Sequence, residues 1–169
     1  DSLRTAKDMG IKGLADINRY GLTLVLGGGE VSLLNMTSAY GVFANEGVRN
    51  EPVAILKVED GAGNTIEEFT QRTETVLPSN TARQISDILS DEEARAPAFG
   101  RHSYLYFAGK DVAAKTGTTN DYRDAWIIGY TPNISVGTWA GNNDNSSMEK
   151  RVAGFIVAPM WNAFMREAL

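Results

Sequence analysis

The sequence predicts a domain of the α+β class, in which helices flank an antiparallel sheet. Three β-like runs lie close together in the last third of the chain, at 112–119, 125–130 and 134–140. Connections of only a few residues between such runs allow antiparallel pairing and exclude parallel crossovers. Apolar residues at helical spacing precede these runs and return after them. The 169 residues, 43% of them hydrophobic, are enough to build one buried core.

Short helices are predicted along the first part of the chain. Segment 3–9 forms a helix that Gly10 ends, and segment 11–20 has short amphipathic character. Ser32 is placed to cap a longer helix that ends at 45–47. The side chains that this helix turns inward are Leu33, Met36, Ala39, Tyr40 and Phe43.

A hairpin and a further helix follow. Residues 52–60 and 65–69 are predicted to pair across the turn at 61–64, because their apolar residues alternate and the turn is rich in glycine. The next helix has Ser79 or Asn80 as its cap. Its inward side chains are Ala82, Ile85, Ile88 and Leu89.

Loops and a last helix complete the predicted fold. The run 91–100 contains a proline and many polar residues, so it is interpreted as a loop. Residues 27–29 are three glycines without the spacing of a phosphate-binding motif, and we expect a turn where backbones approach closely. The C-terminal helix covers 158–169 and is expected to lay three side chains on the sheet, namely Met160, Phe164 and Leu169.

Composition excludes several classes of function. The net charge of -5 provides no positive field for nucleic acid. The chain has no cysteine and one histidine, His102, so disulfides, iron–sulfur clusters and thiolate zinc are excluded and no metal or cofactor is expected. His102 itself is expected in a solvated loop. The Asn-rich run 142–145 lacks the spacing of a calcium loop, and no apolar run approaches the roughly 20 residues that span a bilayer.

The most informative stretch is Lys115-Thr116-Gly117-Thr118-Thr119, in the first of the three predicted strands. Successive side chains of a strand point to opposite faces, so Thr116 and Thr118 share one face and Lys115 takes the other. Gly117 leaves the backbone bare, and a bare strand edge can pair with an extended peptide. The two hydroxyls could then bind a terminal carboxylate, with the ammonium beside the reacting group. The alternative is an exposed edge strand that a lysine protects from aggregation.

This stretch and several others resemble the transpeptidase domain of the bifunctional class A penicillin-binding proteins, where Lys-Thr-Gly is the third active-site motif. The similar segments, in the same order, are 27–32, 36–45, 115–126, 129–132 and 140–144. Segments 88–91 and 94–100 favour the branch called penicillin-binding protein 1C, whereas 142–148 is common in other class A members. The resemblance implies that residues 1–169 are the C-terminal part of a serine D,D-transpeptidase domain with a β-lactamase-like fold.

The resemblance also implies an acyl transfer that needs no cofactor. A serine attacks the penultimate D-alanine carbonyl of a peptidoglycan stem peptide, the last D-alanine leaves, and an amine on a neighbouring strand accepts the acyl group. β-Lactam antibiotics acylate the same serine. Lys115 would act electrostatically and in proton transfer, and the Thr118 N–H would form half of the oxyanion hole. The substrate-binding residues would be Thr116, Gly117, Thr118 and Thr119.

The sequence departs from the family pattern in its nucleophile. Neither Ser-x-x-Lys nor Ser-x-Asn occurs before Lys115, and the chain begins with Asp1. We therefore expect a piece of a longer protein that is inactive without its N-terminal part and is anchored, through that part, on the extracytoplasmic face of the bacterial membrane. Ser147 and Lys150 match Ser-x-x-Lys, but they follow Lys115 in a loop-like stretch and are interpreted as a chance match.

Two other functions stay open on the sequence alone. A non-catalytic peptide-binding or assembly module of the cell-wall machinery could keep the edge strand without a nucleophile. A β-lactamase or β-lactam sensor would share Lys-Thr-Gly, but would not be expected to carry the Asn-Asn-Asp tract at 142–144.

The remaining polar and aromatic residues around the strands are given structural roles. Asp121, Arg123 and Asp124 are expected to form a turn with an internal ion pair. Core and sheet packing is expected for the tryptophans, which are Trp126, Trp139 and Trp161.

Overall fold

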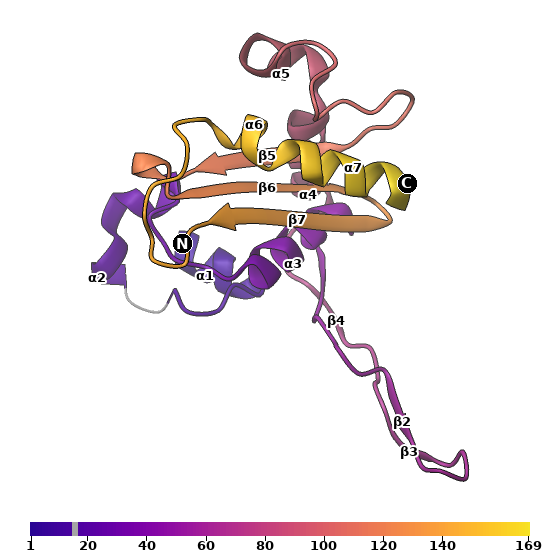
Figure 1. The fold of residues 1–169 in the computed structure, drawn as a ribbon. Helices are drawn as coiled ribbons and strands as arrows, with labels where there is room; N and C mark the ends of the chain where they lie inside the picture. Colours follow the sequence, from indigo (N-terminus) through magenta and orange to yellow (C-terminus); the bar gives the residue numbers. More distant parts are fainter. Residues whose placement is uncertain (15–16) are drawn as a thin grey trace.

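The predicted α+β class is confirmed by the computed structural model, which describes residues 1–14 and 17–169. Helices lie on both faces of a three-stranded antiparallel sheet, and a long hairpin projects from this body (Figure 1). In chain order the elements are α1 (Ser2–Asp8), α2 (Ile17–Tyr20), η1 (Gly21–Leu26), α3 (Leu33–Ala44), β1 (Val48–Asn50), β2 (Lys57–Glu59), β3 (Thr65–Glu68), β4 (Thr73–Thr75), α4 (Ser79–Ser90), α5 (Glu92–Phe99), β5 (Ala113–Thr118), η2 (Asn120–Tyr122), β6 (Asp124–Thr131), β7 (Ile134–Gly141), α6 (Ala153–Ile156) and α7 (Ala158–Ala168).

The sheet is the antiparallel meander that the sequence predicts. Its spatial order is β5-β6-β7, so β6 is central and β5 lies at an edge. The register places Lys115 opposite Ile128 and Gly117 opposite Trp126. The strand that carries Lys-Thr-Gly therefore has one pairing partner, and its other side is not paired with any strand that the structure describes.

The C-terminal helices α6 and α7 cover one face of the sheet and form its main core (Figure 1). Trp161 is fully buried there, and its indole Nε1 donates a hydrogen bond to the Val136 carbonyl at 3.1 Å. A Cβ atom at Gly129 would lie 2.2 Å from the Trp161 ring. The absence of a side chain at Gly129 is therefore what allows the helix to approach the central strand.

The predicted inward face of α7 is wrong for two of its three residues. Met160 and Phe164 are each 57% exposed, whereas Trp161 and Met165 are fully buried. Each residue along a helix turns by about 100°, so the buried stripe is rotated from the predicted one by a single position. The indole has the larger apolar surface, and it takes the space beneath Gly129. Leu169 packs against the same core, as predicted.

Helix α3 lies against the other face of the sheet. Its predicted cap is confirmed, because the Ser32 hydroxyl accepts a hydrogen bond from the Asn35 amide at 3.2 Å. Ala39 is buried as predicted, and Val42, which the sequence pattern did not single out, is equally buried. Aromatic rings of α3 contact the sheet at Tyr130, whose phenol lies 3.0 Å from the Ser86 hydroxyl of α4. Burial raises the pKa of Tyr130.

Helix α4 differs from its prediction at both ends. Pro78 occupies the N-cap position, so neither Ser79 nor Asn80 caps the helix with its side chain. Ala82 is buried as expected, but Ile88 near the C-terminal end is 67% exposed. Proline fixes the backbone that enters the first turn but has no side-chain acceptor, so the helix begins without a side-chain cap.

The run 91–100 was predicted as a loop, and this prediction is wrong because most of it forms α5. The Asp91 carboxylate accepts a hydrogen bond from the Ala94 amide at 2.9 Å, which caps the new helix directly after α4 ends. Pro97 lies inside α5 and suggested a loop. The cap and the ion pair of Arg95 with Glu92 keep this helix of eight residues in place.

The predicted hairpin is confirmed as β2 and β3, and it projects away from the body (Figure 1). The pairing of β1 with β4 at its base was not predicted. Segment 11–20 includes residues 15 and 16, which lie outside the described residues, and its end forms α2.

The three glycines at 27–29 form the expected close turn, since a Cβ at Gly28 would lie 2.9 Å from the Thr23 carbonyl. Within residues 1–14 and 17–169, no helix combines the length and apolar character needed to cross a bilayer.

Candidate functional site

Strand β5 holds the predicted site residues in an extended, accessible row. Lys115, Gly117 and Thr118 are exposed and Thr116 is half-buried. Since β5 is an edge strand, its unpaired side offers backbone groups to an extended ligand. The structure confirms that β5 is an edge strand among the described residues, and its use by a ligand stays a prediction.

The Lys115 ammonium lies along the strand that carries it. Its Nζ donates a hydrogen bond to the carbonyl oxygen of Thr116 at 2.6 Å. This contact keeps the positive charge beside the backbone of the edge strand, within the row of exposed residues. The ammonium is therefore a positive charge beside the exposed part of this edge strand.

The Thr118 hydroxyl connects β5 to the N-terminus of α6. It accepts a hydrogen bond from the Ala153 amide at 2.9 Å. A hydroxyl has one hydrogen and two lone pairs, so this bond leaves the hydroxyl hydrogen available to an incoming anion. Ala153 is the first residue of α6, and sequence reasoning missed it because it lies 35 positions from Thr118.

Gly117 gives the edge strand its bare backbone without being needed for the packing of the sheet. A Cβ atom at this position would meet only the Trp126 Cβ at 3.5 Å, which is an ordinary van der Waals contact. Apart from its neighbours in the chain, no other described atom lies within 4 Å of that Cβ position.

Thr119 has a different set of contacts, within the turn after β5. Its hydroxyl donates to an Asp124 carboxylate oxygen at 3.1 Å and accepts from the Asp124 amide at 2.7 Å. The Trp139 indole donates to the second oxygen of the same carboxylate at 2.9 Å. These contacts use Thr119 to close the turn, and its predicted contact with substrate stays a prediction.

The turn after β5 contains the expected ion pair. Arg123 Nε lies 3.9 Å from the Asp121 carboxylate, and its guanidinium also donates to the Asn145 carbonyl at 2.6 Å. Ser147 and Lys150 lie in a loop, as predicted. Their Ser-x-x-Lys spacing is therefore not the spacing of two neighbouring side chains on a helix. His102 lies in an exposed loop, as expected, with its ring against Tyr106.

Two cavities lie away from the edge of β5. One, of about 270 Å³, lies between α3 and the base of the hairpin, and the other, of about 530 Å³, lies beside α7. Neither is lined by residues 115–119. In the part of the chain that the structure describes, no three His, Asp or Glu side chains gather as a metal site. The candidate site is thus the edge strand itself, which presents Lys115, the threonine hydroxyls and backbone groups.

A lysine and two threonines on the edge strand of an antiparallel sheet, backed by a C-terminal helix, form an arrangement that is typical of serine transpeptidases and β-lactamases. Residues 15–166 match the family model described as the penicillin binding protein transpeptidase domain. The chain belongs to this family.

Two bacterial relatives are similar to the chain over most of its length. It is 39% identical over 155 residues to penicillin-binding protein 1A of Aquifex aeolicus, covering 91% of this chain and 21% of the relative. It is 30% identical over 196 residues to penicillin-binding protein 1A of Rickettsia bellii, covering 99% of this chain and 25% of the relative. The chain therefore spans about a fifth to a quarter of the length of these relatives. The 1C branch stays a prediction.

Solved structures show the same fold. The PonA1 protein from Mycobacterium tuberculosis in complex with penicillin V superposes with a TM-score of 0.79 at 25% identity, covering 97% of this chain and 48% of that chain. Penicillin-binding protein 1A from Haemophilus influenzae gives a TM-score of 0.76 at 21% identity, covering 96% of this chain and 30% of that chain.

Proposed function

We propose that this chain supplies the Lys-Thr-Gly wall of a D,D-transpeptidase that cross-links peptidoglycan stem peptides and binds penicillin. The observation that supports the proposal most directly is the exposed edge of β5, with Lys115, Gly117 and Thr118 in one accessible row. An extended D-Ala-D-Ala end can add to this edge as a further strand. Its terminal carboxylate then accepts hydrogen bonds from the hydroxyls of Thr116 and Thr118.

The proposed reaction is a transfer of an acyl group through a serine ester. The serine oxygen attacks the penultimate D-alanine carbonyl carbon, and the serine proton passes to the leaving amine as the bond to the last D-alanine breaks. An amine on a neighbouring stem peptide then attacks the ester, forms the new amide bond and returns a proton to the serine oxygen. Lys115 stabilises negative charge and assists these proton transfers, and the Thr118 N–H supports the oxyanion.

The nucleophile is proposed to come from a part of the protein outside these 169 residues, because no Ser-x-x-Lys precedes Lys115. Apolar side chains that this part would cover are available on the described surface. Leu22 is 91% exposed, Leu26 89% and Ile88 67%, far more than a packed core allows. Residues 1–169 would then be the C-terminal portion of the domain, and the intact protein would act on the extracytoplasmic face of the bacterial membrane.

A fluorescent penicillin tests the proposed function. We expect the complete parent protein to gain one covalent label per chain, and the isolated 169-residue chain to gain none, since it lacks the nucleophile. An unlabelled parent protein would show that the chain is a non-catalytic binding module. Stoichiometric labelling of the isolated chain would show that the nucleophile lies within it.

Substitution of Thr118 tests the proposed contact between its hydroxyl and the substrate carboxylate. Thr118→Val in the complete protein removes the donor to the carboxylate and also the acceptor of the Ala153 amide. We expect non-covalent penicillin affinity to fall about 10-fold, in line with about 1.4 kcal/mol for a lost charged hydrogen bond, while the acylation step slows less. Stopped-flow kinetics with labelled penicillin resolves the dissociation constant of the non-covalent complex from the rate constant of acylation.

Thr118→Ser is the matched control for that experiment, because it restores the hydroxyl with a smaller side chain. Affinity within about twofold of the parent protein is expected for this variant. Equal loss of affinity in the serine and valine variants would contradict a role for the hydroxyl.

A further inference from the structure

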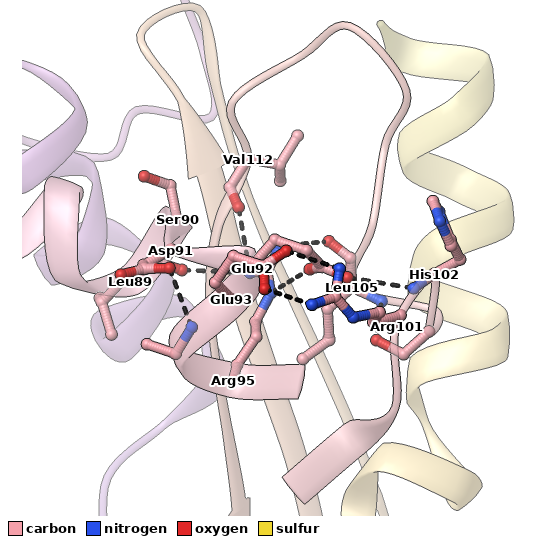
Figure 2. Close-up of polar contacts among 12 residues, drawn as sticks. Leu89, Ser90, Asp91, Glu92, Glu93, Arg95, Arg101, His102, Leu105 and Val112 are labelled. Carbon is pink, nitrogen blue, oxygen red and sulfur yellow. Dashed lines mark hydrogen bonds and ion pairs between the residues drawn. The ribbon is translucent and has the colours of Figure 1, made fainter. Parts of the chain in front are cut away.

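The guanidinium of Arg95, on α5, joins three separate backbone segments (Figure 2). Its Nη1 donates to the Leu89 carbonyl at the end of α4, at 3.2 Å, and to the Val112 carbonyl, at 3.4 Å. Its Nη2 donates to the Leu105 carbonyl at 2.9 Å. A single side chain thus ties the end of α4, the loop after α5 and the residue that precedes β5.

A carboxylate completes this cluster and balances its charge. Arg95 Nε donates to Glu92 at 2.7 Å, and the other Glu92 oxygen accepts from the His102 amide at 3.1 Å (Figure 2). The Arg95 side chain is 13% exposed and that of Glu92 22%, whereas the neighbouring Arg101–Glu93 pair is 68% exposed on both sides. The Arg95 contacts are therefore shielded from water, and each nitrogen of the guanidinium has a specific acceptor.

The position of Val112 makes this cluster relevant to the edge strand. Val112 is buried in the core beside Leu105, and Lys115 follows it by three residues, a distance of about 10 Å along a strand. An interior strand is held on both sides by neighbours, but within the described residues β5 pairs with no strand other than β6. Arg95 adds a contact at the start of β5, beyond its pairing with β6.

We propose that Arg95 is a positioning residue for the Lys-Thr-Gly strand, which it holds in place against α4 through the Val112 carbonyl. The inference rests on the proposed function and adds a residue outside the Lys-Thr-Gly row. A lysine cannot replace Arg95, because one ammonium lacks the planar fork that reaches carbonyls on several sides. Loss of the fork frees the start of β5 and displaces Lys115 and Gly117 from the reacting groups.

The test uses Arg95→Lys and Arg95→Ala in the complete protein, with a fluorescent penicillin as the probe. We expect the acylation rate constant, expressed per molecule able to take the label, to fall about 10- to 100-fold, the size of effect that a displacement of about 1 Å produces. Global destabilisation alone would lower the fraction of labelled molecules and leave this rate constant unchanged. Hydrogen exchange at the amides of residues 113–118 should increase in both variants.

Arg101→Ala is the matched control, since Arg101 makes a two-pronged ion pair with Glu93 in the same region, whereas Arg95 donates to the Val112 carbonyl directly before β5. Its rate constant is expected to stay within about twofold of the parent, as for most exposed pairs. If Arg95→Ala does not fold, the test rests on Arg95→Lys alone. This variant keeps a positive charge beside Glu92 and removes only the fork of the guanidinium. A parent-like rate constant in folded Arg95→Lys overturns the inference, whereas an unlabelled parent protein overturns the proposed function itself.

Discussion

Replacing Lys115 by alanine in the complete protein is expected to lower the second-order rate constant of penicillin acylation about 100- to 10,000-fold, the range found when a group that moves a proton is lost. The Lys115 side chain is exposed on edge strand β5. Its ammonium donates to the carbonyl of Thr116 at 2.6 Å, a neighbour in the chain. Removal of such an exposed side chain should change the free energy of unfolding by less than about 0.5 kcal/mol. The expected result is therefore a large kinetic loss in a folded protein.

Lys110→Ala is the control for this experiment. Lys110 lies five positions before Lys115, is also exposed, and donates to the Leu169 carbonyl at 2.6 Å. It shares the charge and the surface position of Lys115 but does not lie on the edge strand. We expect its acylation rate constant to match that of the parent protein within about twofold. Similar rate constants in Lys110→Ala and Lys115→Ala would remove Lys115 from the site.

The sheet and its edge could be predicted from the sequence because their signals are local. Each strand is a run of β-forming residues between short polar turns, and sequential strands with short connections pair as neighbours. The cap of α3 is local as well, since Ser32 and Asn35 are three residues apart. The alternation of side chains along β5 then placed Lys115 and Thr118 on opposite faces without any knowledge of the rest of the fold.

The cluster around Arg95 could not be predicted, because its partners are far apart in the sequence. Arg95 reaches acceptors 3, 6, 10 and 17 positions away, and only the first of these is a spacing that a helix makes recognisable. The attachment of Thr118 to Ala153 spans 35 positions and depends on where α6 begins. Such contacts depend on tertiary packing, and the pattern of residues within a single helix or strand does not predict them.

The face of α7 that packs on the sheet was misassigned for a related reason. Met160 and Phe164 have helical spacing, and so do Trp161 and Met165 one position later. The choice between the two stripes depends on Gly129, more than 30 residues earlier, because only a residue without Cβ leaves space for the indole. A pattern within the helix alone cannot contain that information.

The largest loss of stability is expected for Trp161→Ala in the complete transpeptidase domain, about 3–5 kcal/mol in the free energy of unfolding. The side chain is fully buried, packs edge-on against Phe107 with ring centroids 5.6 Å apart, and satisfies the Val136 carbonyl. Its removal leaves both a cavity and an acceptor without its donor. Urea denaturation measures the change, and Trp139→Ala, which removes an indole that is 37% exposed, should cost less than half as much. Equal losses in the two variants would contradict the assignment of Trp161 as the centre of the core.

Gly129→Ala tests the same contact from the side of the sheet. The new Cβ would lie 2.2 Å from the Trp161 ring and 2.7 Å from the Ala113 carbonyl, so overpacking should cost about 1–3 kcal/mol. Gly117→Ala, in the same sheet, meets only an atom at 3.5 Å and should leave the free energy of unfolding nearly unchanged. In the double variant Gly129→Ala with Trp161→Ala, the cavity accepts the added methyl group, so the combined loss should be smaller than the sum of the two single losses. Strict additivity would mean that the glycine and the indole do not share this space.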